Sequence, residues 1–255
     1  MVVWVVALAL LGLWSARRDP PTVPEQRDIA EALPVLERAT SAVLAAADGP
    51  GRAVRLEALR LDRGCRLTPV RAGVAATRDV TVFVPADQAR VALDAIVAGL
   101  PPGYRAHVSR SADGGLDLHA DAGSYVAIDA EAPAGAQVLT VEASTGCRPP
   151  AALGAANPRA GEPPRALADA VRAFHGSAEP TVRAVACADG RTAATYTVDG
   201  LPRTGDLGRS LAPVTAGAVV VRSDPRSWAY RAGAVSVVVD AEPTATRVSA
   251  TTPCP

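Results

Sequence analysis

The sequence predicts an α+β protein of two tandem, duplicated units behind an N-terminal apolar membrane or signal segment. We expect each unit to run α-β-β-α and then to continue as an antiparallel β-meander. Three observations predict this fold. Helix-period and strand-period runs alternate in the same order in both halves, short motifs recur in the same order, and each half carries two cysteines. Helices should therefore pack on one face of each antiparallel sheet.

The apolar run over residues 2–14 is short for a membrane-spanning helix, which needs about 20 residues, and fits the apolar region of a signal peptide. Arg17 and Arg18 follow the run and no positive charge precedes it, which is explained if translation begins upstream of Met1. A cleaved signal and an uncleaved anchor both remain open, and a buried N-terminal helix is the alternative.

Proline, glycine and alanine content marks the expected boundaries of the units. We expect a signal or anchor at 1–16, a tether at 17–24, a first α+β unit at 25–147, a Pro/Gly/Ala linker at 148–164 and a second α+β unit at 165–255.

In the first unit, apolar residues at helical spacing predict helices, and alternating runs predict strands. The expected helices cover 25–47 and 87–98; the expected strands lie near 53–61, 72–84, 104–110, 115–120, 123–130 and 137–143. Pro34 is expected to kink the first helix or to begin its second half.

The second unit repeats this order. The expected helices cover 165–174 and 206–212; the expected strands cover 181–187, 191–198, 217–222, 227–231, 234–240 and 246–251. Both halves place Ala-Ala-Thr soon after their first cysteine, at 75–77 and at 193–195. The order of several such matches, more than any one of them, predicts a duplication.

The four cysteines allow three pairings, of which the duplication favours Cys65–Cys147 and Cys187–Cys254. Each bridge would join the beginning of a unit to its last strand. The sequence contains no C-x-x-C, the spacing typical of metal-binding and redox-active cysteines. Structural disulfides imply an oxidising, extracytoplasmic compartment. Reactive, metal-bound or free buried cysteines are the alternatives.

Composition excludes several mechanisms. All 26 basic residues are arginine, so Schiff-base lysines, P-loops and kinase lysines are absent. The formal net charge is +0 and arginines are interspersed with acids, which argues against a nucleic-acid partner. Aromatic residues make up 4% of the chain, so valine, leucine and alanine must build the core.

Two histidines suggest a metal site. His107 and His119 flank a turn predicted at 113–115, and a register that pairs residue 108 with 118 would place them opposite each other. Asp117 and Asp121 share their face, so a Zn²⁺-type ion is conceivable there. The alternative, which we favour, is a solvated polar face.

Two pairs of carboxylates recur at the same place in both halves, Asp129 with Glu131 and Asp240 with Glu242. Residues i and i+2 of a strand share a face, so each pair suits a cation site or an acid–base pair. A solvated strand end before a proline turn is the simpler interpretation.

Trp228 and Tyr230 form an aromatic pair with Arg222 and Arg231 nearby, which suits a patch that binds a glycan or a protein. Packing in the core or on an edge strand is the alternative that we favour.

Export, duplication of a small scaffold and the absence of a nucleophile–base motif together favour a non-enzymatic extracytoplasmic binding module of a cell envelope. We expect no cofactor, contact with the membrane through the N-terminal segment, and a partner that is an envelope protein or a wall component. The alternatives are a metal-dependent hydrolase centred on His107 and His119, and a structural ectodomain that scaffolds an envelope complex.

Overall fold

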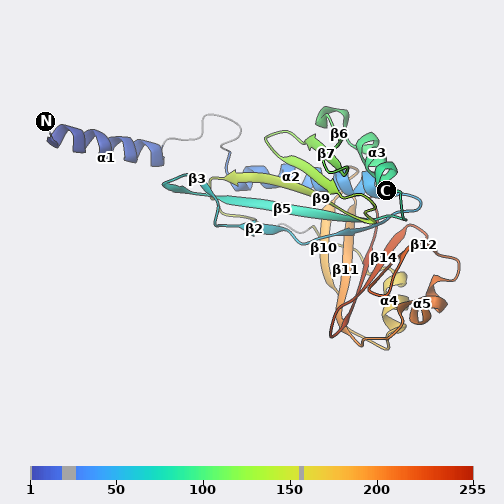
Figure 1. The fold of residues 1–255 in the computed structure, drawn as a ribbon. Coiled ribbons are helices and arrows are strands. Elements are labelled where there is room, and N and C mark those ends of the chain that lie inside the picture. The colour runs from blue at the N-terminus through green and yellow to red at the C-terminus, as the bar shows by residue number, and fades with distance from the viewer. Residues whose placement is uncertain (1, 19–26, 155–157, 255) are drawn as a thin grey trace.

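The computed structural model describes residues 2–18, 27–154 and 158–254, which form two antiparallel sheets with helices on one face of each (Figure 1). The helices are α1 (Val2–Arg18), α2 (Ile29–Ala47), α3 (Ala89–Gly99), the 3-10 turn Pro102–Tyr104, α4 (Arg165–Arg172) and α5 (Leu207–Thr215). The first half contains β1 (Ala53–Leu56), β2 (Arg60–Asp62), β3 (Arg66–Thr68), β4 (Arg71–Ala72), β5 (Val74–Phe83), β6 (His107–Arg110), β7 (Leu116–Asp121), β8 (Ala127–Ala132) and β9 (Val138–Arg148). The second half contains β10 (Thr181–Ala186), β11 (Thr192–Leu201), β12 (Val219–Ser223), β13 (Ser227–Ala232), β14 (Val235–Ala241) and β15 (Thr246–Thr251).

The α+β class is confirmed, and the two sheets share one strand order. The first sheet runs β1-β5-β9-β8-β7-β6, with β2 also paired to β5, and the second runs β10-β11-β15-β14-β13-β12. In each half one helix precedes the sheet and one helix joins its second strand to the edge of the meander. In the first half these helices are α2, which covers β5 and β9, and α3, which covers β6 and β7; in the second half they are α4 and α5.

Helix α2 begins at an ordinary N-cap, because the side chain of Asp28 accepts a hydrogen bond from the backbone N–H of Glu31 at 3.0 Å. The helix continues through Pro34 to Ala47, so Pro34 does not divide it into two helices. Its buried residues, among them Leu36 and Leu44, pack on the first sheet and build a core of small and aliphatic side chains.

One departure from the prediction lies in the segment before β5. We predicted one strand near 53–61; the structure has two short strands, β1 and β2, separated by three residues. Residues 66–72, predicted mostly as loop, form a separate two-stranded hairpin, β3–β4. Backbone hydrogen bonding from Gly73 to Cys65 at 2.9 Å closes the base of this hairpin.

The two halves pack against each other through the free edge of β1. The backbone N–H of Leu56 donates to the hydroxyl of Thr195 in β11 at 2.9 Å, so the second sheet satisfies a donor of this edge strand. Thr195 itself bonds Thr251 at 2.8 Å, and all of these hydroxyl and amide groups are buried. Val185 belongs to the core cluster of the first half, so that core extends into the second half, which also has a core of its own.

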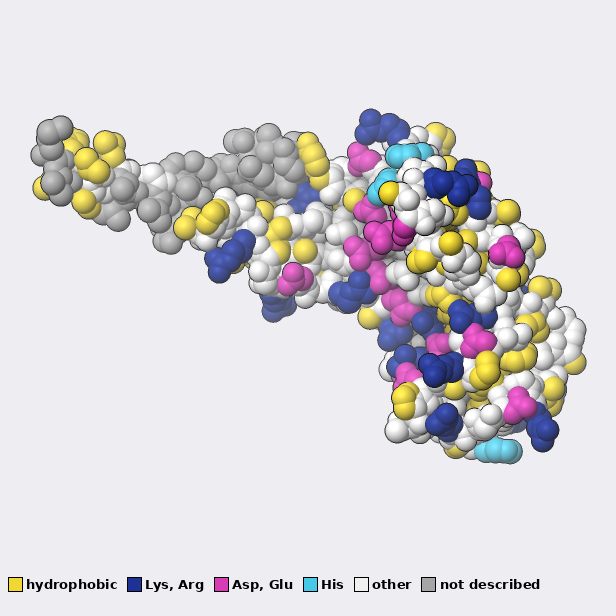
Figure 2. All heavy atoms as spheres, viewed as in Figure 1, with side chains coloured by type: hydrophobic (Ala, Val, Ile, Leu, Met, Phe, Trp, Pro, Cys, Tyr) yellow, Lys and Arg dark blue, Asp and Glu magenta, His cyan; other side chains and the backbone are white. Residues whose placement is uncertain are grey.

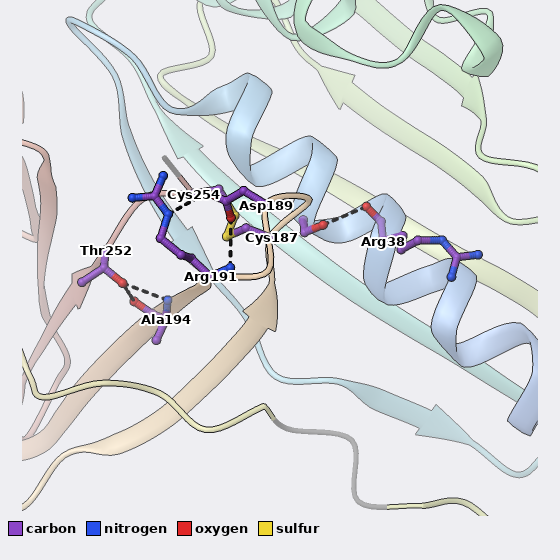
Figure 3. The surroundings of a disulfide bond; sticks show 8 residues. Arg38, Cys187, Asp189, Arg191, Ala194, Thr252 and Cys254 are labelled. Carbon is purple, nitrogen blue, oxygen red and sulfur yellow. Dashed lines mark hydrogen bonds and ion pairs between the residues drawn. A yellow bond between two sulfur atoms is a disulfide. The ribbon is translucent and has the colours of Figure 1, made fainter.

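Both predicted disulfides are present. Cys65 is bonded to Cys147, and Cys187 is bonded to Cys254. The second disulfide lies beside α2, and Cys187 packs into the core of the first half (Figure 3). Next to it, Arg191 is held by the carboxylate of Asp189, with Nε to Oδ2 at 2.6 Å. Two disulfides indicate an oxidising, extracytoplasmic environment.

At the N-terminus, α1 carries large apolar side chains that are mostly exposed: Val3 is 80% exposed, Trp4 75% and Leu8 64%. In the part of the chain that the structure describes, no helix has the length and apolarity needed to cross a membrane. The predicted tether at 17–24 lies largely outside the described residues, as do residues 155–157 of the predicted linker. Arg148, the first residue of that linker in our prediction, is instead the last residue of β9 and is buried.

Candidate functional site

A row of ionisable side chains crosses the face of the first sheet that carries no helices. The register pairs His107 with His119, His119 with Asp129, Asp129 with Glu142, and Glu142 with Asp79. These five residues come from β6, β7, β8, β9 and β5, and because paired residues of antiparallel strands point to the same side, they share one face.

A second row lies two residues further along each strand, where Asp117 pairs with Glu131. Between the rows, the alternating residues Leu118, Ala130 and Val141 point to the other side and are buried under the helices. The sequence thus folds into a sheet with one apolar and one acidic face. Figure 2 shows acidic side chains gathered in a band that starts beside histidines on the visible face of the first half.

The face is hollowed over the paired strands β7 and β8 and the turn that precedes β7. We call this hollow the β7–β8 groove; its volume is about 700 Å³. Its lining residues are Ser111, Ala112, Asp113, Gly115, Asp117, His119, Asp129, Ala130, Glu131, Ala132 and Pro133. Four of them are carboxylates and one is an imidazole, so the groove attracts positive charge.

Arginines neutralise the row at its other end. Arg60 contacts Asp79 with Nη1 to Oδ2 at 2.6 Å and reaches Glu142 with Nη2 to Oε2 at 3.5 Å. Arg55 bridges Glu57 in the first half and Asp240 in the second. Among the described residues, no arginine forms an ion pair with a carboxylate of the β7–β8 groove.

Burial and neighbouring carboxylates act in the same direction on the pKa of Glu142. Burial raises the pKa of Glu142, and the charges of Asp79 and Asp129 raise it further, while Arg60 lowers it. The pKa of Asp113, in the turn between β6 and β7, is lowered instead. The hydroxyl of Ser111 donates to the carboxylate of Asp113 and lowers its pKa.

The structure brings together part of the predicted histidine site. His107 lies opposite His119, with ring centroids 5.9 Å apart, as the predicted register requires. The carboxylate nearest His119 is that of Asp129, with Nδ1 to Oδ1 at 2.7 Å, and not one of the two that we predicted. Asp121 instead pairs with Arg105 at 3.1 Å.

Asp117 lines the groove beside His119. Within residues 2–18, 27–154 and 158–254, no three histidine, cysteine, aspartate or glutamate side chains are grouped closely enough to hold a metal ion. A metal at His107 and His119 therefore stays a prediction, which the zinc content of purified protein and of a His119→Ala variant tests.

The predicted aromatic patch is divided between two faces of the second sheet. Tyr230 is 1% exposed and Trp228 is half-buried, and both pack in the core of the second half, where Trp228 lies against Gly208 of α5. Arg231 points to the first half and pairs with Asp48. Arg222 pairs with Asp224 at 2.6 Å.

The two recurring carboxylate pairs also separate. Asp129 and Glu131 line the groove, whereas Asp240 is bonded to Arg55 and Glu242 to Arg247. Of the two pairs, only the first thus has no arginine partner among the described residues, although Asp129 contacts His119. Sequence reasoning missed Glu142 and Asp79 as members of the acidic row, because nothing in the sequence states that β5 and β9 are neighbours.

Comparison of the chain with protein-family models, with curated proteins and with solved structures found no match. A function must therefore be inferred from the chemistry of the acidic face.

Proposed function

We propose that this protein is a non-enzymatic extracytoplasmic interaction module that is held at a membrane by its N-terminal segment and binds a basic segment of an envelope protein in the β7–β8 groove. The observation that carries the proposal is the lining of the groove, in which four carboxylates face a single imidazole and no arginine. These carboxylates attract a ligand that carries several positive charges.

The shape of the groove supports a peptide as the ligand. It is a partly open hollow on the face of a sheet, and its volume of about 700 Å³ suits several side chains. The sheet below it is rigid, because β7 and β8 are central strands backed by the buried residues Leu118 and Ala130. Carboxylates held on such strands keep their spacing, which favours recognition of a defined arrangement of charges.

Titration calorimetry with an octa-arginine peptide tests the proposal. At low salt we expect binding that the double substitution Asp117→Asn/Glu131→Gln weakens at least tenfold. The matched control is Glu162→Gln/Glu179→Gln, which removes one exposed carboxylate before α4 and one between α4 and β10. It should leave the affinity unchanged. Because the attraction is electrostatic, 0.5 M salt should abolish it.

Two outcomes would contradict the proposal: absence of binding at low salt, and equal weakening by the groove variant and the control variant. A module that only scaffolds a complex would give the first outcome. A metal-dependent hydrolase would instead bind stoichiometric zinc and lose it in His119→Ala.

We further propose that the two units arose by duplication. The identical strand order of the two sheets supports it, as do the matching places of the helices. Both disulfides join the segment after the first strands of a half to the end of its last strand. A crystal structure tests this proposal, because a different strand order in either sheet would contradict it.

A further inference from the structure

We propose that the β3–β4 hairpin is a membrane-contact element that binds the anionic headgroups of the membrane in which the N-terminal segment lies. The proposal rests on the membrane attachment in the proposed function, and adds a second contact with the lipid surface. Two observations support the proposal. The hairpin is basic and partly apolar, and it lies at the end of the first sheet where α2 begins.

The hairpin is basic. Arg63 and Arg66 are exposed and Arg71 is half-exposed, and among the described residues none of the three forms an ion pair with a carboxylate. Asp62 is the one acidic residue between positions 62 and 72, so the segment has a clear positive excess. Five other arginines of the first half form ion pairs with carboxylates: Arg55, Arg60, Arg78, Arg90 and Arg105.

The tip of the hairpin is also apolar. Val70 is 56% exposed, and Pro69 beside it is exposed as well. The side chain of Arg66 donates to the main-chain oxygen of Pro69 at 3.0 Å, which holds the turn in place. Arginines around an exposed aliphatic tip suit the boundary between headgroups and acyl chains, where the guanidinium groups meet phosphates and the apolar tip leaves water.

The hairpin lies where the chain arrives from the N-terminal segment. The backbone N–H of Ile29, the first residue of α2, donates to the main-chain oxygen of Pro149 at 3.0 Å. Pro149 is two residues from Cys147, which is bonded to Cys65 at the base of the hairpin. In Figure 1, β3 lies at the end of the first sheet where α2 begins, and the second half lies at the other end.

The length of chain between the two contacts allows both at once. Nine residues lie between Arg18 at the end of α1 and the N-cap Asp28, so the Cα atoms of these two residues are at most about 36 Å apart when the chain is extended. An N-terminal segment in the membrane therefore holds the start of α2 within about 36 Å of that segment, which leaves the hairpin within reach of the lipid surface. The acidic groove on β7 and β8 is not part of this contact and stays available to a partner.

Flotation of the full-length chain with vesicles tests the proposal. The probes are neutral phosphatidylcholine vesicles and vesicles with 30% phosphatidylglycerol, at low salt. The N-terminal segment should bind both, and the hairpin should strengthen binding to the anionic vesicles by on the order of 100-fold, because each arginine near an anionic surface contributes about fivefold. The variant Arg63→Gln/Arg66→Gln/Arg71→Gln should lose this preference.

The control variant Arg203→Gln/Arg209→Gln/Arg226→Gln removes three exposed arginines of the second half and should keep the preference. Hydrogen exchange of residues 63–72 in anionic and neutral nanodiscs gives a second readout, with protection expected only in the anionic discs. Equal binding to both vesicles, or equal loss in both variants, would overturn the proposal. The same hairpin variant should still bind octa-arginine, because its β7–β8 groove is unchanged. Peptide binding and vesicle binding therefore test the two proposals separately.

Discussion

Arg78 of β5 donates from Nη2 to the main-chain oxygen of Ala184 in β10 at 3.1 Å, and this hydrogen bond joins the two halves of the protein deep in their interface. The side chain of Arg78 is 1% exposed, and its Nη1 donates to both carboxylate oxygens of Glu37 in α2, at 2.7 and 2.8 Å. One side chain thus connects a helix and a strand of the first half to a strand of the second.

Arg78→Gln should destabilise the protein by about 3–5 kcal/mol, because it leaves the carboxylate of Glu37 half-buried without its partner. Burial already raises the pKa of Glu37, and only Arg78 opposes this effect. Urea unfolding measures the change. Arg90→Gln breaks an exposed pair with Asp94 and should cost no more than about 0.5 kcal/mol. Equal costs for the two variants would contradict this role of Arg78.

Glu142 should make the protein less stable as the pH rises. Its pKa is raised above the ordinary 4.5, so above pH 4.5 the folded protein holds this proton more tightly than the unfolded chain does, and stability falls until the group is ionised in both states. Glu142→Gln should therefore raise the melting temperature at pH 7 and leave it unchanged at pH 4. A variant that is less stable than the wild type at pH 7 would mean that attraction to Arg60 outweighs the cost of burial together with the repulsion from Asp79 and Asp129.

Gly73 is required by the first disulfide. A Cβ atom at this position would overlap the Sγ atom of Cys147 and lie 2.9 Å from the main-chain oxygen of Arg148. Gly73→Ala should cost about 1–3 kcal/mol, as overpacking does elsewhere, and should lower the yield of the Cys65–Cys147 bond. Thermal unfolding and peptide mapping measure the two effects. Gly103→Ala, where no atom lies within 4 Å of the added methyl, is the control and should behave like the wild type.

Removing either disulfide should cost a similar amount of stability. The bridges close loops of 82 and 67 residues, for which chain entropy gives about 4–5 kcal/mol each. Cys65→Ser/Cys147→Ser and Cys187→Ser/Cys254→Ser can be compared by urea unfolding. A cost below about 1 kcal/mol for both would show that apolar packing, and not the bridges, stabilises the fold.

Local patterns were sufficient to predict a large part of the fold. The spacing of apolar residues placed the helices to within a few residues, and the turn around Gly114 set the register that brings His107 opposite His119. The cysteine pairing followed from the order of the motifs, because matching positions in two similar halves need matching bridges.

Relationships between distant segments were not predictable in this way. Alternation shows that Trp228 and Tyr230 share a face, but it does not show that α4 and α5 cover that face. Likewise, the acidic row depends on β5 lying beside β9, which are separated in sequence by a helix and three strands. Side-chain periodicity states which residues point together, and only the topology states which of those faces meet solvent.

The most direct test of this account is the state of the four cysteines in protein taken from its native cells, trapped by alkylation before any reduction and mapped by mass spectrometry. We predict two bonded peptides, Cys65 with Cys147 and Cys187 with Cys254, and no alkylated thiol. Four alkylated cysteines, or a bond between the halves, would contradict an extracytoplasmic protein built from two separately bridged units.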